Sequence, residues 1–312
     1  MKGIMSGFHL LISMSIIARF LFLFFCFSFS QDTFSIVAVD PETNEVGSAG
    51  ASCIAGSVII SDIHPGVGAI HTQSYWLAAN QANASELMSL GASPDEIIDY
   101  LINNDVQNNP SIRQYGVIDL VNGGRSAAFT GEGCFDYKNH ILGDTYSIQG
   151  NILLGQDILD QMEIGFLNTE GTLSDKLMAA LQGANVPGAD TRCLDDGISS
   201  LSAFIRVANP DDNSNFPNLN INVNNVNFAG YLIDPIDSVQ TLYDMWLYEQ
   251  ILPGDVNQDL NIDVLDVVAI INFILGVSNP SPIEFMSSDL NQDGIINIQD
   301  IIQIINIIIS EN

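Results

Sequence analysis

The chain has 312 residues, of which 47% are hydrophobic, so it can bury a sizeable core and is not a wholly disordered protein. Its 37 Asp and Glu residues outnumber its 8 Lys and Arg residues, which gives a formal net charge of −29. A surface this acidic repels phosphate backbones and attracts divalent cations, which argues against nucleic acid as a partner.

Residues 1–30 have the pattern of an export signal. Lys2 and Arg19 precede the apolar run FLFLFFCFSFS, and small residues stand just before a cleavage site at Gln31. A retained membrane anchor and a lipoprotein cysteine at Cys26 are the alternatives, but Arg19 divides the apolar stretch and leaves it too short to span a bilayer. We therefore expect a secreted protein without a membrane span after cleavage, either free outside the cell or attached to its surface.

Removal of the signal leaves three cysteines, Cys53, Cys134 and Cys193. An oxidising compartment favours one disulfide and one free thiol, and the sequence leaves all three pairings open. No histidine lies at zinc-ligand spacing from these cysteines, so a zinc site is not expected.

The first part of the mature chain alternates apolar and polar residues, as strands do. Strands are expected at residues 33–40, 45–53 and 67–74, and helices at residues 75–90 and 93–103. The run Ser93-Pro94-Asp95-Glu96 supplies a cap, a proline and two acidic residues at the start of the second helix.

A second group of elements has the same order of strands and then helices. It comprises a hairpin across Asn122-Gly123-Gly124, a strand, two helices and a final strand, at residues 113–131, 146–154, 156–168, 173–185 and 200–208. This order predicts sheets packed between helical layers.

The composition changes after residue 208 to a segment rich in Asn, in which LNINVN predicts an edge strand and residues 236–250 a helix. Turn residues at 252–254 mark the expected domain boundary. We divide the chain into a signal peptide (1–30), a larger domain (31–250, with its core at 33–207 and the Asn-rich segment and helix at 208–250) and a small domain (251–312).

The pattern Asp-x-Asn-x-Asp occurs twice near the C-terminus, 34 residues apart, and opens two 12-residue loops. Calcium takes six to eight oxygen ligands, and each loop offers side-chain oxygens at positions 1, 3, 5, 9 and 12 and a main-chain carbonyl at position 7. The expected ligands are Asp255, Asn257, Asp259, Asn261, Asp263 and Asp266 in the first loop, and Asp289, Asn291, Asp293, Ile295, Asn297 and Asp300 in the second. Each loop is expected to bind one Ca²⁺ ion; an Asn/Asp turn repeat without metal is the alternative.

The two loops differ at position 6, where the chain turns sharply. Gly294 suits this turn, whereas Leu260 predicts a more strained and weaker first site. Ile262 and Ile296, at position 8, should point towards the core. Apolar helices at residues 267–275 and 301–309 follow the loops and should pack on each other.

No helix is expected directly before either loop, unlike in a full EF-hand. Residues 254–312 resemble a type I dockerin, and the run GDVNQDLNIDVLDVVAIINFILG carries nearly the whole repeat of that family. The resemblance implies folding on calcium and binding to a cohesin-like domain of a scaffold or surface protein. It places partner-recognition positions at Val264, Leu265, Ile271 and Asn272 in the first copy and Ile298, Gln299, Ile305 and Asn306 in the second. A module that only stabilises the tail is the alternative.

Residues 33–207 resemble the domain-of-unknown-function 1028 family in the stretches TFSIVAVDPETNEVG, GVGAIHTQSYW, RQYGVIDL, AAFTGEGC, YSIQGNILLG, LMAALQGA and GADTRC. The resemblance implies an α+β fold, the four-layer αββα sandwich of N-terminal-nucleophile hydrolases. In that fold a Thr, Ser or Cys freed at the N-terminus attacks an amide, with its own α-amino group as base.

Thr33 begins the family-like strand and is the candidate nucleophile, provided that Gln31 and Asp32 are removed. An ordinary strand residue is the alternative interpretation of Thr33, and Ser52 and Cys53 are alternative nucleophiles. Asn151, in the run Gln149-Gly150-Asn151, is the second catalytic candidate, because its amide can stabilise an oxyanion.

Gln73-Ser74 and Asp190 to Arg192 are further polar groups in family-like stretches, with structural hydrogen bonding as the alternative to a site role. His64, His71 and His140 show no spacing that predicts a Ser-His-Asp triad.

The sequence therefore predicts an exported amide hydrolase, with an unknown substrate, that is docked to a complex through calcium loops. A non-catalytic binding or structural component of an extracellular, polysaccharide-degrading complex is the alternative.

Overall fold

The computed structural model describes residues 33–224, 227–228, 231–259 and 261–310. The predicted signal, its cleavage site at Gln31, and Leu260 in the first calcium loop lie outside these residues. Within them, no helix is both long and apolar enough to cross a membrane.

A six-stranded antiparallel sheet forms the centre of the larger domain, in the order β10-β9-β2-β1-β8-β7. The hairpin of its two central strands turns through Asn44, whose φ is 59°. The strands are β1 (Phe34–Asp40), β2 (Glu45–Ser52), β7 (Asn139–Gly143), β8 (Tyr146–Gly150), β9 (Ser202–Ala208) and β10 (Leu219–Asn224). The run LNINVN is therefore an edge strand, as its alternation predicts.

A second antiparallel sheet of four strands has the order β3-β4-β5-β6. Its strands are β3 (Ser61–His64), β4 (Gly68–Gln73), β5 (Gln114–Asp119) and β6 (Arg125–Thr130). The predicted hairpin is the β5–β6 pair, whose turn uses Asn122 and Gly123 at φ 58° and 88°. Strands β3 and β7 were not predicted; both are short strands at sheet edges, where alternation gives little signal.

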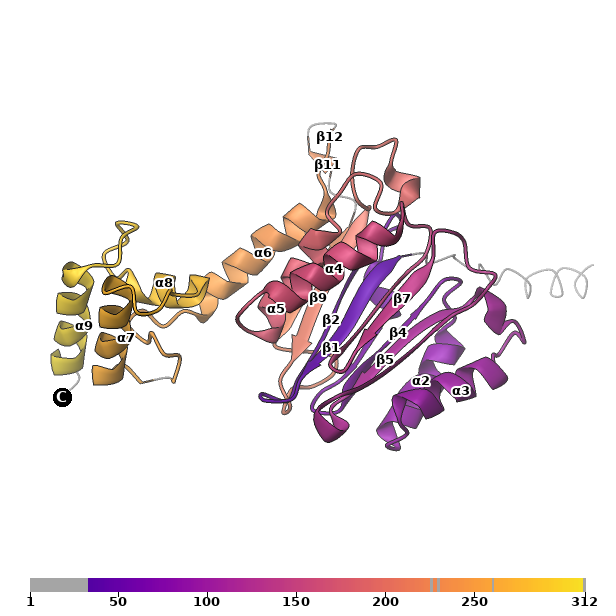
Figure 1. The fold of residues 1–312 in the computed structure, drawn as a ribbon, viewed down its shortest axis with the longest axis horizontal. Coiled ribbons are helices and arrows are strands. Elements are labelled where there is room, and N and C mark those ends of the chain that lie inside the picture. The colour runs from indigo at the N-terminus through magenta and orange to yellow at the C-terminus, as the bar shows by residue number, and fades with distance from the viewer. Residues whose placement is uncertain (1–32, 225–226, 229–230, 260, 311–312) are drawn as a thin grey trace, which may run out of the picture.

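Four helices complete the sandwich, as Figure 1 shows. The first two, α2 (Ala78–Ser89) and α3 (Pro94–Asn103), pack on the four-stranded sheet, and α4 (Gln156–Asn168) and α5 (Leu173–Gly183) pack on the six-stranded one. The predicted αββα class is confirmed. The structure also has short 3₁₀ turns at Ser57–Ile60, Pro110–Ile112, Val121–Gly123 and Thr191–Cys193 and a two-stranded ribbon of β11 (Asn227–Phe228) and β12 (Tyr231–Leu232).

Local sequence sets the helix starts. The side chain of Ser93 accepts from the main-chain N–H of Glu96, whose carboxylate accepts from Ser93 in return, as the capping sequence predicts. The preceding helix starts at Ala78 rather than at residue 75, because Ser74 and Tyr75 have φ values of 53° and 48° and cannot continue a right-handed helix.

The space between the two sheets has an apolar half and a polar half. Val37 and Val39 of β1 point into it and pack against Ile63, Ala69 and Ile118. The opposite face of β1 packs on the apolar core under α4 and α5. Towards the start of β1 the residues between the sheets become polar, although they are equally buried. A buried polar region needs internal partners, so this end of the sandwich is the place to look for chemistry.

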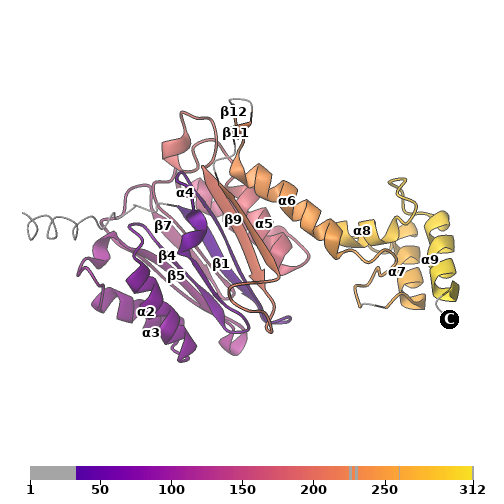
Figure 2. The same cartoon turned by 180° about the vertical axis from the view of Figure 1, so that it is seen from behind.

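Helix α6 (Pro235–Gln250) leads from the sandwich to the C-terminal helices, α7 (Val264–Ile274), α8 (Pro282–Ser288) and α9 (Ile298–Ser310) (Figures 1 and 2). The hydroxyl of Tyr243 in α6 donates to Ser174 Oγ at 2.9 Å and Asp175 Oδ1 at 2.8 Å. These bonds attach α6 to the sandwich at the start of α5.

The C-terminal helices differ from the expectation in two ways. Helix α8 lies directly before the second calcium loop, where no entering helix was expected; a capping box of Ser281 and Glu284, with Pro282 at its first turn, starts it. Helices α7 and α9 each begin three residues early, at Val264 and Ile298. They pack on each other as predicted, around Val256, Ile270, Ile301 and Ile304 and with Ile262 and Ile296 at the edge.

Candidate functional site

Thr33 lies directly before β1 and is 1% exposed. The next residue, Phe34, pairs with Ala51 of β2 and Gly150 of β8, so Thr33 lies between Ser52 and Asn151. Because alternate residues of a strand share a face, Thr33 points with Val37 into the space between the sheets. Its hydroxyl donates to the carbonyl of Ala51.

Gln73, Gln114 and Asn151 surround Thr33 from both sheets. The side-chain amide of Gln73 donates to the Thr33 carbonyl at 3.2 Å and to Gln114 Oε1 at 2.8 Å. Asn151 donates its main-chain N–H to the same Thr33 carbonyl at 3.1 Å and its Nδ2 to Gln114 Oε1 at 2.8 Å. All four residues are at most 1% exposed. Both predicted catalytic residues therefore meet in one buried cluster, together with Gln73 from the predicted polar pair.

Asn151 Oδ1 is buried and has no hydrogen-bond partner among the described residues. The Nδ2 group of the same side chain donates to Gln114, whose own Nε2 donates to Thr130 Oγ1 and the Gly150 carbonyl, both at 2.9 Å. This network fixes which atom of each amide is oxygen. The unpartnered atom is an acceptor, so it fits an ammonium or N–H donor better than an oxyanion.

The polar cluster continues away from Thr33 through Ser35 and His71. The hydroxyl of Ser35 donates to Gln73 Oε1 at 2.6 Å and lies 2.8 Å from His71 Nδ1. The other ring nitrogen, Nε2, lies 2.6 Å from Ser48 Oγ. Burial, together with the positive charge of Arg206, lowers the pKa of His71 to about 3, so the imidazole is neutral at physiological pH. No sequence pattern placed His71 in this cluster, because its partners are distant in the chain.

Backbone strain is concentrated beside this cluster. Ser74 and Tyr75, directly after Gln73, have φ values of 53° and 48°, and Ile152, directly after Asn151, has φ 57°. A β-branched residue at positive φ is an outlier that costs of order 1–3 kcal/mol. Strain of this kind persists only where the surroundings enforce it, and it is commonest at binding and active sites.

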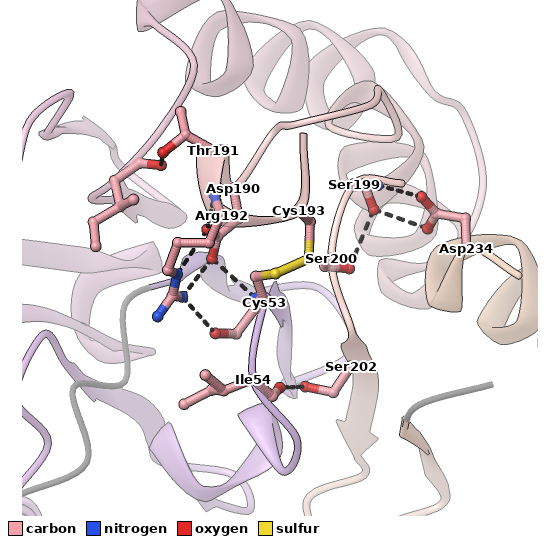
Figure 3. The surroundings of a disulfide bond; sticks show 12 residues. Cys53, Ile54, Asp190, Thr191, Arg192, Cys193, Ser199, Ser200, Ser202 and Asp234 are labelled. Atoms are coloured by element: carbon pink, nitrogen blue, oxygen red, sulfur yellow. Dashed lines mark hydrogen bonds and ion pairs between the residues drawn. A yellow bond between two sulfur atoms is a disulfide. The ribbon is translucent and has the colours of Figure 1, made fainter. Parts of the chain in front are cut away.

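A disulfide joins Cys193 to Cys53, the residue directly after Ser52, with a Cα–Cα distance of 5.7 Å (Figure 3). This settles the pairing that the sequence left open and leaves Cys134 as a buried thiol. The alternative of Cys53 as nucleophile is wrong, because its sulfur is bonded to Cys193. Ser52 remains next to Thr33 on the neighbouring strand.

Asp190 and Arg192 lie on the same side, as Figure 3 shows. Asp190 is fully buried, accepts from the main-chain N–H of Cys53 at 2.9 Å, and pairs with Arg192 through Nε (2.9 Å) and Nη2 (2.5 Å). Arg192 Nη2 also lies 3.3 Å from Ser52 Oγ. These residues thus extend the cluster around Thr33 to the surface, since the Arg192 side chain is 29% exposed.

His64 ends β3 and pairs with Gly68, at the opposite end of β4 from Gln73, beside a cavity of about 580 Å³. Its Nε2 contacts both Ser85 Oγ (3.1 Å) and Asp62 Oδ2 (3.3 Å). A catalytic triad needs the serine and the carboxylate on different ring nitrogens. Ser85 shares Nε2 with Asp62, and Ser89 Oγ, which lies 3.5 Å from the other ring nitrogen, Nδ1, donates its proton to the Ser85 carbonyl at 2.9 Å.

In the first predicted calcium loop, residues 255–266, main-chain N–H groups donate to side-chain oxygens of the same loop. The main-chain N–H of Asp259 donates to Asp255 Oδ1 and Asn257 Oδ1, both at 3.1 Å. Asp266 is fully buried and accepts from the main-chain N–H of Asn257 at 3.1 Å. The carboxylates at positions 1 and 12 therefore belong to one hydrogen-bonded loop.

The second loop, residues 289–300, repeats this arrangement. Asp293 N–H donates to Asp289 Oδ1 (3.1 Å) and Asn291 Oδ1 (2.9 Å), and buried Asp300 accepts from Asn291 N–H (3.4 Å). The residue at position 4 has a left-handed φ in both loops, 60° and 56°. Two sequences with the same spacing thus fold into the same turn.

The predicted ligands at position 9 of each loop lie at the starts of the helices that follow. Asp263 and Asn297, at position 9, accept from main-chain N–H groups in the first turns of α7 and α9, at 2.7 and 2.8 Å. In the described part of the chain, no three His, Cys, Asp or Glu side chains form a metal group by themselves. A calcium loop also uses amide and main-chain oxygens, which Asn257, Asn261 and Ile295 supply, so the donor set fits a hard cation.

Much of the surface of α7 and α9 is apolar. The predicted recognition residues Val264, Leu265, Ile271, Ile298 and Ile305 are all exposed. Apolar surface gathered on two adjacent helices marks an interaction site.

The comparisons with known proteins agree with this geometry. A sequence model described as a family of unknown function (DUF1028) matches residues 33–228. The chain belongs to this family. The crystal structure of a DUF1028 protein from Silicibacter pomeroyi is similar at a TM-score of 0.56 and 24% identity, over 69% of this chain and 88% of that one. At this identity the likeness shows the fold alone. A comparison with curated proteins finds no match.

Residues 253–309 match the dockerin type I domain. Both resemblances drawn from the sequence are thereby confirmed. Type I dockerin domains bind calcium and imply a cohesin-type partner in an extracellular complex. This DUF1028 chain thus combines a sandwich of a family of unknown function with a docking module.

Proposed function

We propose that this DUF1028 chain is an exported amide hydrolase whose nucleophile is Thr33, tethered to a cohesin-containing complex by residues 251–312. The observation that carries the proposal is the buried cluster of Thr33, Gln73, Gln114 and Asn151, in which Asn151 Oδ1 has no partner within the described residues. A buried polar group without a partner costs about 1–3 kcal/mol, which a purely structural cluster would avoid.

The chemistry starts with cleavage between Asp32 and Thr33, which frees the α-amino group of Thr33. The free pKa of such an amine is about 7.7–8.0, so it can take the proton of the Thr33 hydroxyl near neutral pH. The hydroxyl oxygen then attacks the carbonyl carbon of the substrate amide, and the amine returns the proton to the departing nitrogen. Water hydrolyses the resulting ester by the same route and regenerates the hydroxyl.

Asn151 has a positioning role in this scheme. It directly follows β8 and lies beside Thr33, and its unpartnered Oδ1 accepts an N–H of the freed α-amine in this proposal. Gln73 and the Asn151 main chain hold the Thr33 carbonyl from two sides. The amine lone pair is thereby oriented towards the hydroxyl of the same residue.

The test of this function is hydrolysis of a panel of N-acyl amides by the secreted protein and two variants. We expect Thr33→Ala to abolish turnover with an unchanged melting temperature, and Thr33→Ser to retain part of the activity because it keeps a hydroxyl. Turnover by a folded Thr33→Ala variant would contradict the proposal. A wild-type chain inactive on every amide would favour the alternative, a non-catalytic component of the same complex.

For the docking module we propose one Ca²⁺ ion in each loop, bound by the twelve residues predicted from the repeat. The matching hydrogen bonds of the two loops support this. Titration calorimetry on the full chain should show two sites. Calcium-dependent capture on an immobilised cohesin domain tests the partner, and capture that persists in chelator would contradict a calcium-folded dock.

A further inference from the structure

We propose that His71 is a positioning residue for Thr33: its Nδ1–H group fixes the hydroxyl of Ser35, which through Gln73 fixes the carbonyl of Thr33. The nucleophilic role of Thr33 rests on the proposed function, whereas the coupling of His71 to the Thr33 carbonyl does not. The assignment follows from the orientations of the side-chain amides, the position of one hydroxyl proton and the tautomer of the ring.

Main-chain carbonyls fix the amides nearest to Thr33. Gln114 Nε2 donates to the carbonyls of Asn139 (3.0 Å) and Gly150 (2.9 Å), so its Oε1 is the atom that accepts on the other side. Gln73 Nε2 donates to this Oε1 at 2.8 Å and to the Thr33 carbonyl at 3.2 Å. Both Nε2 protons of Gln73 are thereby used, and its own Oε1 remains as an acceptor.

The hydroxyl of Ser35 has one proton, and Gln73 Oε1 takes it. The two oxygens are 2.6 Å apart, and a carboxamide oxygen can only accept. Ser35 Oγ also accepts from Gln149 Nε2 at 2.7 Å. One acceptor position is left on Ser35 Oγ, and His71 Nδ1 lies 2.8 Å from this oxygen. Ser35 can therefore only accept from His71.

The proton of the imidazole must then be on Nδ1, because two lone pairs would otherwise face each other across 2.8 Å. Burial, together with the charge of Arg206, lowers the pKa of His71 to about 3, so the neutral ring has this one proton. Nε2 is then an acceptor, and Ser48 Oγ, at 2.6 Å, is its donor. Gln149 Nε2 lies 3.1 Å from Nδ1, but its protons go to the hydroxyl (2.7 Å) and carbonyl (3.3 Å) of Ser35.

The other end of this chain of hydrogen bonds is a cation. Ser48 Oγ is 2.8 Å from Ser61 Oγ, which accepts from Arg206 Nη1 at 3.1 Å. Hydrogen bonds that are linked in series polarise one another, and they are electrostatically stronger inside a protein than in water. His71 thus connects the guanidinium to the carbonyl of Thr33, and from Ser48 onward every donor points towards Thr33.

His71 differs in this respect from the other histidines. Among the histidines of the described residues, only His71 is fully buried and has a hydroxyl oxygen within 2.8 Å of each ring nitrogen. His140 contacts Thr130 Oγ1 through Nδ1 at 2.9 Å, and the His64 side chain is 15% exposed beside its cavity. An apolar residue in place of His71 would leave the proton of Ser35 undirected. His64 is the matched control.

The first measurement is the tautomer of the ring. The secreted full-length protein, with calcium present, is labelled with ¹⁵N in its histidine rings, and the His71 resonances are those that His71→Gln lacks. We expect Nδ1 to give the resonance of a protonated nitrogen at neutral pH and Nε2 that of an unprotonated one. A ring protonated at Nε2 would overturn the proposal, and this result needs no folded variant beyond the assignment.

Two variants then separate the ring nitrogens. The amide nitrogen of Asn is one bond from Cγ, as Nδ1 is, so His71→Asn keeps a donor for Ser35. The amide of Gln is one bond further out, as Nε2 is, so His71→Gln keeps only the contact with Ser48. The probe is the carbonyl ¹³C resonance of Thr33, which Thr33→Ser assigns in protein labelled at threonine. We expect His71→Gln to shift this resonance, His71→Asn to shift it less, and His64→Asn to leave it in place. An unmoved resonance in folded His71→Gln would overturn the proposal.

Kinetics test the consequence for the proposed nucleophile. On an amide that the wild type hydrolyses, His71→Gln should lower kcat at least about tenfold and leave KM within about twofold, because a misplacement of about 1 Å can cost about a hundredfold. His71→Asn should retain more of kcat, and His64→Asn nearly all of it. A raised KM at unchanged kcat would overturn the positioning role. A chain that hydrolyses no amide yet gives both NMR results would contradict the proposed function and support the coupling of His71 to Thr33.

Discussion

At the scale of single residues, the larger domain is organised by polar side chains that are buried between two sheets. Thr33, Ser35 and His71 are each at most 1% exposed, yet they lie in one continuous set of hydrogen bonds. Full burial has a consequence for ionisation. A buried imidazole loses its hydration when charged, and here Arg206 adds repulsion, so the neutral form is strongly preferred.

This preference predicts that stability falls in acid. The pKa of His71 in the folded chain is about 3, below its ordinary value near 6.5, so between these values the unfolded chain binds a proton that the folded chain does not. The contribution is complete above about pH 6.5 and is lost as the pH falls to about 3, with a slope of about 1.4 kcal/mol per pH unit.

Urea unfolding at a series of pH values checks this slope. His71→Gln, which cannot gain the proton, should unfold at lower urea at neutral pH but with a flatter dependence between pH 6 and 4, as the linkage relation requires. Equal slopes for the two proteins would show that His71 does not titrate as described.

At the scale of elements, the disulfide joins the end of β2 to the 3₁₀ turn at Thr191–Cys193, across 140 residues of sequence. A link over so long a loop restricts the unfolded chain strongly, by about 4–5 kcal/mol in the chain-entropy description. It also holds the turn that carries Arg192 against the start of the site.

Replacing both Cys53 and Cys193 with serine should therefore lower the free energy of unfolding by about 4–5 kcal/mol. Chemical denaturation of the wild type and the double variant measures the difference, with Cys134→Ser as a control that leaves the disulfide intact. A loss no greater than that of the control would mean that the link does not form in the secreted protein.

The local sequence pattern was sufficient to predict some helices and strands but not others. The capped start at Ser93 and the edge strand LNINVN were predicted, because the residues that decide them are adjacent in sequence. Strands β3 and β7 and helix α8 were missed because they are short. In the candidate site, Thr33 and Asn151 came from a family resemblance, whereas Gln114 and His71 were not found because only the pairing of distant strands brings them to Thr33.

At the scale of the whole molecule, a sandwich with its own apolar core is followed by a small bundle whose core is four buried side chains and their neighbours. The bundle places several of its carboxylates in two loops, where their mutual repulsion needs a cation. A metal ion that binds only the folded state stabilises that state by about 2.7 kcal/mol when its free concentration is about a hundred times its dissociation constant. The sandwich has its own apolar core, so we expect its fold to persist without the ion.

Chelation should therefore unfold α7 and α9 and leave the sandwich intact. Circular dichroism with and without chelator should show a loss of helical signal that added calcium restores, while the near-ultraviolet signal of the sandwich aromatics is retained. The same titration on an Asp255→Ala, Asp289→Ala variant is the control, since it should show the low-helix signal at every calcium level. Unchanged helicity of the wild type in chelator would contradict metal-dependent folding.

The central claim is that this chain acts through an amino-terminal threonine, and the most direct measurement is the identity of the first residue of the secreted protein. N-terminal sequencing, together with intact mass, should give Thr33, with its α-amine free and unmodified. A mature chain that begins at Gln31, or at any residue other than Thr33, would contradict the account.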